Sequence, residues 1–155
     1  MKVIIAGAGE AGTYLANLLY KAKRDIIIID LNKEKLRYID AHYDFLTQHG
    51  SGTSIQDLKK IGIAKTDLFI ALTQSEEINL TATILAKKLG AKKVIARIDN
   101  REYLEKNNET FFKELGIDSL IYPEILASDE IVSLLSRVGA SKTFSFAGFS
   151  KCHSI

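Results

Sequence analysis

The chain has 155 residues, with 21 Lys and Arg against 19 Asp and Glu and a net charge of +2. This length suits one domain, and the near-neutral charge excludes the strongly basic surface that is typical of nucleic-acid binding. The single cysteine excludes an intrachain disulfide, and no apolar stretch approaches the roughly 20 residues that a membrane-spanning helix needs. We therefore expect a cytoplasmic domain with no nucleic-acid partner and no direct insertion into a membrane.

The first turn of the chain is rich in glycine. The apolar run Lys2–Ala6 predicts a strand, and the six residues after it lead into a stretch with helical spacing. In the dinucleotide-binding fingerprint, the first glycine permits a tight turn, the second lets the backbone approach a pyrophosphate, and the third lets helix and strand pack closely. The anion lies at the helix N-terminus, where N–H groups and the helix dipole stabilise it. The candidate cofactor-binding residues here are Gly7, Ala8, Gly9, Glu10, Ala11 and Gly12.

An acidic residue ends the second apolar run. Ile26–Ile29 is continuously β-branched, as expected for a parallel strand covered on both faces, and Asp30 follows it. Asp30 lies close to the offset of about 20 residues after the glycines at which an acid binds a ribose hydroxyl, and it favours NAD over NADP. The structural alternative is a glycine turn that only connects a strand to a helix.

Strand and helix patterns then alternate along the chain. The expected helices are Ala11–Ala22, Lys33–Ile39, one through Leu58 to Ile61 after a Thr53 or Ser54 cap, Glu76–Leu89 and Arg101–Leu115. The further expected strands are Asp44–Gln48, Leu68–Leu72 and Lys93–Ile98. About six alternations predict an α/β fold with a doubly wound, mostly parallel sheet, which is a Rossmann-like architecture.

In such a sheet, ligands bind beyond the carboxyl ends of the strands, where the strand order reverses. The expected strands place four loops at that edge, and Arg97 lies near the end of its own strand. These loops are Gly7–Gly12, Asp30–Asn32, Gly50–Thr53 and Thr73–Ser75.

Pro123 begins a last helical pattern, at a position where a missing N–H is tolerated. Periodicity alone does not distinguish a core stripe from a subunit interface, so both interpretations stay open. We expect one domain over residues 1–140, with residues 141–155 the start of a further strand or a linker, truncated or tagged. The apolar residues of the pattern are Ala127, Ile131, Leu134, Leu135 and Val138, and Thr143–Phe146 alternates like one more strand.

The sequence indicates binding rather than catalysis. The phosphate-binding loop of nucleoside triphosphatases needs a lysine where Thr13 follows Gly12, and Glu10 adds negative charge that disfavours a triphosphate. No tyrosine has a lysine four residues later, as a short-chain dehydrogenase would, and we expect no catalytic residues and no metal site. Two alternatives are an NAD-dependent oxidoreductase fragment that lacks its substrate domain, and an interaction domain with a vestigial site.

Five segments, taken in order, resemble the RCK (also called KTN) nucleotide-binding domain. Within that family they are most similar to the regulatory subunits of bacterial Trk-type potassium-uptake systems. The resemblance covers about residues 1–146. The segments are GAGEAG, IIIIDLNKEKL, HGSGTSIQDLKKIGI, LFIALTQSEEINLTATILAKKLGAKKVIARIDNREY and GIDSLIYPEILASDEIV.

The resemblance implies a cytoplasmic regulatory subunit that binds NAD or NADH, or in some relatives ATP or ADP. Such a subunit gates a membrane potassium-transport subunit and lies at the inner face of the membrane through that partner. The resemblance implies that the glycine turn holds the pyrophosphate, Asp30 the adenosine ribose, Thr73 and Gln74 the second half of the nucleotide, and Arg97 the phosphates or the nicotinamide side. A C-terminal crossover helix from Glu124 would join a homodimer or a larger ring.

The chain departs from the family in two respects. Relatives often carry Gly-Asp-Ala-Thr where this chain has Gly50-Ser51-Gly52-Thr53, so one acid is missing while Thr53 stays a candidate ligand. Full Trk-type subunits are also longer and contain a second lobe. We therefore expect an isolated N-terminal domain.

Overall fold

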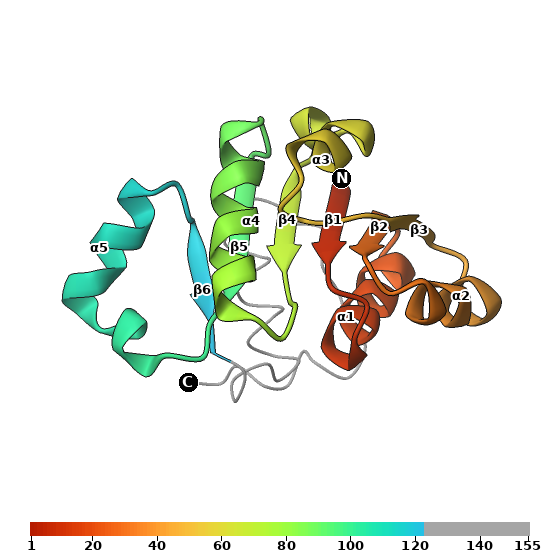
Figure 1. Cartoon of the computed structure of the whole chain (residues 1–155), viewed down its shortest axis with the longest axis horizontal. Helices are drawn as coiled ribbons and strands as arrows, with labels where there is room; N and C mark the ends of the chain where they lie inside the picture. The colour runs from red at the N-terminus through yellow and green to blue at the C-terminus, as the bar shows by residue number, and fades with distance from the viewer. Residues whose placement is uncertain (123–155) are drawn as a thin grey trace.

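The structure, a computed structural model, describes residues 1–122, and it confirms the doubly wound α/β fold (Figure 1). The strands are β1 Lys2–Ala6, β2 Asp25–Asp30, β3 Leu46–His49, β4 Leu68–Ala71, β5 Lys93–Arg97 and β6 Ser119–Ile121. The helices are α1 Glu10–Lys21, α2 Lys33–His42, α3 Ile55–Lys60, α4 Glu76–Lys88 and α5 Lys106–Glu114, with 3-10 turns η1 Ile63–Lys65 and η2 Arg101–Leu104.

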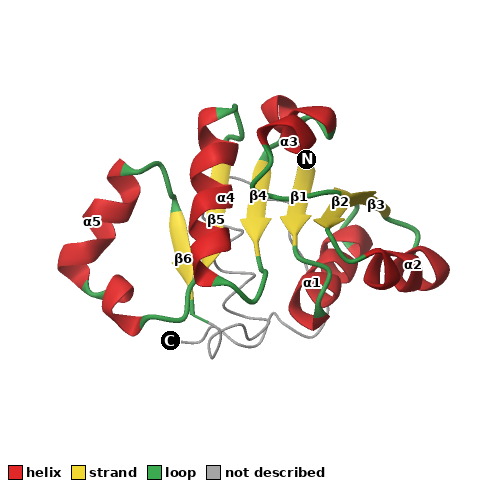
Figure 2. Ribbon diagram, in the orientation of Figure 1, coloured by secondary structure: helices red, strands yellow, loops and turns green. Residues whose placement is uncertain are grey.

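All neighbouring strands pair in parallel, in the order β3-β2-β1-β4-β5-β6. Ile5 at the centre of β1 pairs with Ile28 of β2 on one side and with Ile70 of β4 on the other. The chain first builds the sheet outward from β1 through β2 to β3, and then returns to the other side of β1 with β4. The strand order therefore reverses between β1 and β4, and Figure 2 shows the carboxyl ends of these two strands facing the same edge.

Alternate residues of the central strands feed two separate core layers. Val3 and Ile5 pack with Leu15 and Leu19 of α1, whereas Ile4 packs with residues of α3 and α4. Because both faces are covered, the central strands are nearly continuous apolar runs, as parallel strands usually are. A third, smaller cluster joins α5 to α4 and β5; its buried members are Ala96, Phe112 and Ile117.

The expected helix Arg101–Leu115 is wrong as one element, because the backbone breaks at Glu105. That residue has φ −63° and ψ 142°, which is extended backbone, and it separates η2 from α5. The expected strand Asp44–Gln48 begins later, at Leu46, because the backbone bends at Asp44 and Phe45, so the parallel pairing with β2 starts at Leu46 opposite Ile27. The other elements predicted within residues 1–122 are present, with ends shifted by a few residues.

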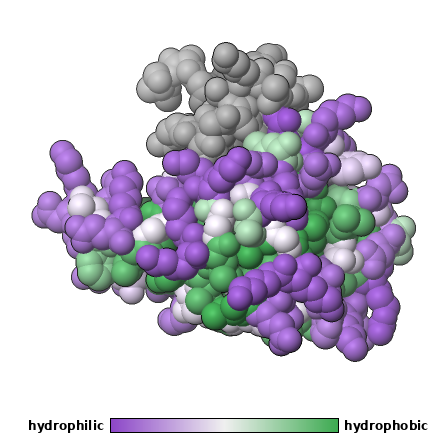
Figure 3. All heavy atoms as spheres, turned by 90° about the horizontal axis from the view of Figure 1, so that it is seen from above, coloured by the Kyte–Doolittle hydropathy of each residue, from purple (hydrophilic) through white to green (hydrophobic). Residues whose placement is uncertain are grey.

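The helix expected from Glu124, with its stripe Ala127–Val138, and the strand expected at Thr143–Phe146 lie outside the described residues. Within residues 1–122, no helix is both long enough and apolar enough to cross a bilayer. In Figure 3, hydrophilic residues are interspersed with apolar ones over the face seen there, as on an ordinary globular surface.

Candidate functional site

Backbone hydrogen bonds gather the predicted loops at the carboxyl edge of the sheet. Gly7 donates its N–H to the carbonyl of Ile29, and Leu72 donates to the carbonyl of Ala6. Gly50 donates to the carbonyl of Asp30 in the same way. The glycine turn, Asp30, the Gly50–Thr53 loop and the loop after β4 are therefore neighbours around the switch point.

Two glycines of the first turn are required by the local geometry. Gly7 has φ +123°, a conformation that side chains disfavour, and a Cβ there would lie 2.9 Å from the backbone of Leu72. A Cβ on Gly12 would lie 2.0 Å from the carbonyl oxygen of Gly7. These contacts hold the first turn of α1 directly against the end of β1, as the sequence predicts.

Gly9 and the start of α1 are open instead. Among residues 1–122, no atom beyond the adjacent residues lies within 4 Å of the place where a Cβ on Gly9 would be, and no side chain caps α1. By contrast, Asn32, Ser54 and Ser75 cap α2, α3 and α4 with side-chain oxygens. The first N–H groups of a helix have no intrahelical partner, so the start of α1 is suited to an anion.

The Asp30 carboxylate already accepts hydrogen bonds from nearby backbone N–H groups. Its Oδ2 accepts a 2.7 Å hydrogen bond from the Ala8 N–H, and its Oδ1 accepts one of the same length from the Asn32 N–H. The Ala8 N–H is therefore directed to Asp30 rather than to a phosphate. A carboxylate has about four acceptor positions, so Asp30 can still accept from ribose hydroxyls.

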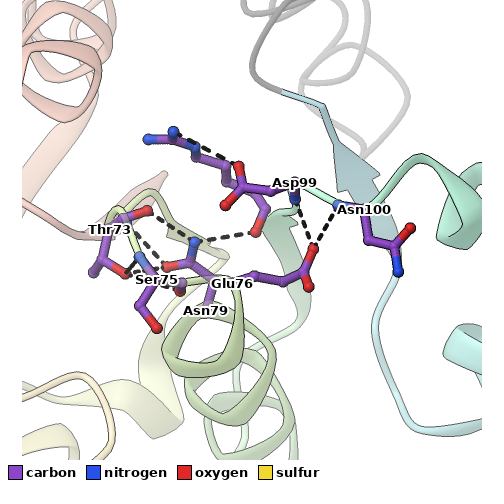
Figure 4. Close-up of polar contacts among 7 residues, drawn as sticks. Thr73, Ser75, Glu76, Asn79, Asp99 and Asn100 are labelled. Atoms are coloured by element: carbon purple, nitrogen blue, oxygen red, sulfur yellow. Dashed lines mark hydrogen bonds and ion pairs between the residues drawn. The ribbon is translucent and has the colours of Figure 1, made fainter.

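The loop after β4 is held by hydrogen bonds to a buried side chain of α4. Thr73 donates its N–H and its hydroxyl to Oδ1 of Asn79, at 2.9 and 2.7 Å (Figure 4). Gln74, the next residue, is exposed. Asn79 is 1% exposed, and the sequence analysis missed its role. The sequence feature that could have revealed this role is a polar residue on the same helix face as the buried Ala82 and Thr83.

Arg97 brings a partly satisfied cation to the same edge. Its Nη2 lies 3.8 Å from Oδ1 of Asp99, and its buried Nε has no hydrogen-bond partner in the part of the chain that the structure describes. The adjacent backbone is fixed by Glu76, whose Oε2 accepts from the N–H groups of Asp99 and Asn100, both at 2.7 Å (Figure 4). A buried donor without a partner is rare in folded proteins, so Arg97 is a reasonable group to meet a ligand.

The Gly50–Thr53 loop is tied together by its own side chains. The Thr53 hydroxyl lies 2.9 Å from that of Ser51, and Asp57 accepts from the Ser51 N–H at 2.9 Å. A Cβ on Gly52 would come within 3.1 Å of the Ala6 side chain, so this loop packs over the end of β1. Asp57 thus places a carboxylate beside the Gly50–Thr53 turn, which has no acidic residue of its own.

A groove of about 450 Å³ opens beside the glycine turn, between α1 and α2. Its residues are polar and aromatic, and a cavity of this size suits a small molecule. They are Ala8, Gly9, Glu10, Thr13, Tyr14, Asn17, Lys35, Tyr38 and Tyr43.

The histidines of the described chain have structural contacts. His42 stacks on Tyr38 and hydrogen-bonds to its carbonyl through Nδ1, and Nε2 of His49 lies 3.1 Å from the carbonyl oxygen of Leu31. Among residues 1–122, no group of three or more His, Cys, Asp or Glu side chains is arranged to hold a metal. Cys152 and His153 lie outside the described residues.

The chain is similar to several known proteins. It is 39% identical over 149 residues to the Trk system potassium uptake protein TrkA of Haemophilus influenzae, and 35% identical over 150 residues to a TrkA homolog of Archaeoglobus fulgidus. These matches cover 95% and 96% of this chain but only 32% and 33% of the relatives, so the chain spans about a third of their length.

The fold has a counterpart among solved structures. The GsuK channel bound to NAD superposes with a TM-score of 0.65 at 17% identity, over 84% of this chain and 22% of that one. The family model described as the TrkA-N domain matches residues 3–123. Since that match includes most of the chain, the protein belongs to the TrkA-N domain family.

Proposed function

We propose that this domain binds NAD or NADH as a sensor, without turning it over. The observation that carries the proposal is the uncapped start of α1, with Gly9 open beside it and Asp30 next to the turn. Backbone N–H groups of the Gly7–Gly12 turn hold the diphosphate, and Asp30 accepts from the adenosine ribose. Thr73, Gln74 and Arg97 line the other half of the nucleotide, and Thr53 borders it.

The charges near the turn support a dinucleotide. Asp30 would repel a 2′-phosphate, which favours NAD over NADP. Glu10 is exposed at the first position of α1, where it opposes the extra charge of a triphosphate. ATP and ADP are therefore the weaker candidates and serve as comparison ligands.

In the cell, the domain would regulate a membrane potassium-transport subunit from the cytoplasmic side. Supporting this role, the curated relatives are named as potassium uptake proteins, and a structural neighbour is a channel bound to NAD. The proposed assembly is a homodimer, or a larger ring, joined through the segment that contains Ala127–Val138. A nucleotide shifts such an assembly only by its different affinity for two conformations.

Calorimetric titration of the 155-residue chain with NAD, NADH, ATP and ADP tests this proposal. We expect binding of NAD or NADH and weaker binding of ATP. Absence of binding by all four nucleotides would exclude a nucleotide sensor. Reduction of NAD on addition of a simple alcohol or hydroxy acid, followed by NADH absorbance, would instead support an oxidoreductase.

The assembly is tested separately by light scattering at two protein concentrations. A dimer at the higher concentration supports an interface between copies of the chain. A monomer at both concentrations would contradict the proposed assembly but would leave nucleotide binding intact.

A further inference from the structure

The buried side chain of Asn79 connects two loops at the carboxyl edge of the sheet. Its Oδ1 accepts from the Thr73 N–H and hydroxyl, and its Nδ2 donates to the carbonyl oxygens of Thr73 and Arg97, at 2.9 and 3.0 Å. A side-chain amide has two donor hydrogens and two acceptor lone pairs, and all four are used here. Asn79 therefore fixes the loop after β4 to the end of β5.

Glu76 makes a second connection from the same helix end. Its Oε2 accepts from the consecutive N–H groups of Asp99 and Asn100, and Ser75 caps the helix between the two loops (Figure 4). The turn at Asp99 and Asn100 leads directly into η2 and α5. The start of α4 is thus joined to that turn by two short charge-assisted hydrogen bonds.

We propose that Asn79 and Glu76 are positioning residues that make the loop after β4 and the turn after β5 one unit. A nucleotide that meets Thr73 then also orders the turn at Asp99 and Asn100, and through it the entry to η2. This inference rests on the proposed nucleotide binding, and it adds a route by which a bound ligand changes a distant segment. The positions of the two loops depend strongly on each other, because loss of the Asn79 side chain leaves buried backbone groups of both loops without a hydrogen-bond partner.

The chain offers matched controls for both residues. Thr83 is fully buried on the same face of α4, but its hydroxyl donates only to carbonyls of its own helix, those of Asn79 and Leu80. Glu77 carries the same charge as Glu76 at the same helix end, but its Oε1 accepts from the Ser75 hydroxyl instead. Substitution of either control changes stability or charge without cutting the connection between the loops.

Hydrogen exchange with and without NADH, together with NADH titration, tests the inference on the full chain. In the wild type, NADH slows exchange of the Asp99 and Asn100 amides. Asn79→Ala and Glu76→Ala abolish that slowing, whereas Thr83→Ala and Glu77→Ala retain it. Asn79→Ala also raises the NADH Kd about tenfold, since the loop must now be ordered on binding, while Thr83→Ala lowers the melting temperature at an unchanged Kd.

Two results would overturn the inference: slowing that persists in both Asn79→Ala and Glu76→Ala, or equal increases of Kd in Asn79→Ala and Thr83→Ala. If the wild type binds no nucleotide, the proposed function fails, and the connection is judged in the free protein. There, Asn79→Ala must speed exchange of the Thr73 amide well beyond the effect of Thr83→Ala. Equal rates would show that Asn79 only stabilises the helix.

Discussion

The two halves of the carboxyl edge of the sheet, where the candidate ligand loops lie, differ in how their backbone polar groups are paired. Around β1, the Gly7 and Ala8 N–H groups are paired within the protein, but the space at Gly9 is open and no described side chain caps the first N–H groups of α1. Around β4 and β5, side chains of Ser75, Glu76 and Asn79 already occupy the backbone groups of the loops. The first half is available to an anion, whereas the loops of the second half are joined to each other before any ligand binds.

The sharpest way to break this contrast is Gly12→Ala. The added Cβ would lie 2.0 Å from the Gly7 carbonyl oxygen, so the turn or α1 must shift. We expect a loss of about 3 kcal/mol in the free energy of unfolding, measured by urea denaturation, together with loss of NADH binding. Gly9→Ala is the control, since it meets nothing within 4 Å and its backbone is extended. It should change stability by less than about 0.5 kcal/mol yet weaken NADH binding; equal stability of the two variants would contradict the packing argument.

The next largest effect is expected at Asp30. Asp30→Ala removes the ribose acceptor and the partner of the Ala8 N–H, so NADH binding should weaken by about 1.5 to 3 kcal/mol in calorimetric titration. Asn32→Ala provides the control, because Asn32 caps α2 through its side chain while its own N–H still reaches Asp30. Its cost should appear in stability alone. An unchanged affinity in Asp30→Ala would place the ribose elsewhere and favour a vestigial site.

Ser75→Ala tests the half of the carboxyl edge around β4 and β5. The Ser75 hydroxyl accepts from the Ile78 N–H and caps α4, so its loss should cost about 1 kcal/mol of stability. Because Asn79 still holds Thr73, we expect the NADH affinity to fall by much less than in Asp30→Ala. A larger loss of affinity than of stability would show that this half binds the nucleotide through the cap itself.

Most of the fold was predictable because local signals agreed with the global architecture. Apolar runs such as Ile26–Ile29, and capping residues such as Ser54, mark elements that the structure contains. The break at Glu105 was not predictable, since the residues on both sides of it have helical spacing and the extended backbone of that one residue divides them. The strand at Leu46 starts late because the backbone bends at Asp44 and Phe45, and the local sequence pattern does not show that bend.

The candidate site was predictable only for residues with special backbone requirements. Gly7 and Gly12 follow from a motif whose spacing has a steric reason. Asn79 and Glu76 do not, because their partners lie 18 to 24 residues away, at Arg97, Asp99 and Asn100, and a sequence pattern does not show which backbone groups a side chain meets across a sheet edge. The roles of Asp30, Thr53, Thr73, Gln74 and Arg97 toward a nucleotide stay predictions.

The smallest expected effect concerns the opposite edge of the sheet, where Asp67 precedes β4. The Lys2 N–H donates to its carboxylate, and the Lys92 ammonium lies 3.1 Å away; these contacts hold the pKa of Asp67 below its ordinary value of 3.8. A lowered pKa stabilises the fold above the unfolded-state value, and the stabilisation is lost as the pH falls through the lower folded value. Because the Lys92 side chain is 74% exposed, we expect these contacts to contribute less than about 1 kcal/mol to the free energy of unfolding.

Urea denaturation from about pH 6 to about pH 3 measures this contribution, and Asp67→Asn should make the stability less steep in acid. The NADH affinity at neutral pH should not change in this variant, since Asp67 lies at the amino ends of β1 and β4 while the ligand loops lie at their carboxyl ends. An Asp67→Asn variant with the wild-type acid dependence would assign that dependence to other carboxylates. A reduced NADH affinity would show instead that the two edges of the sheet are coupled, and the contrast between an open and a preformed half would then have to include the strands that join them.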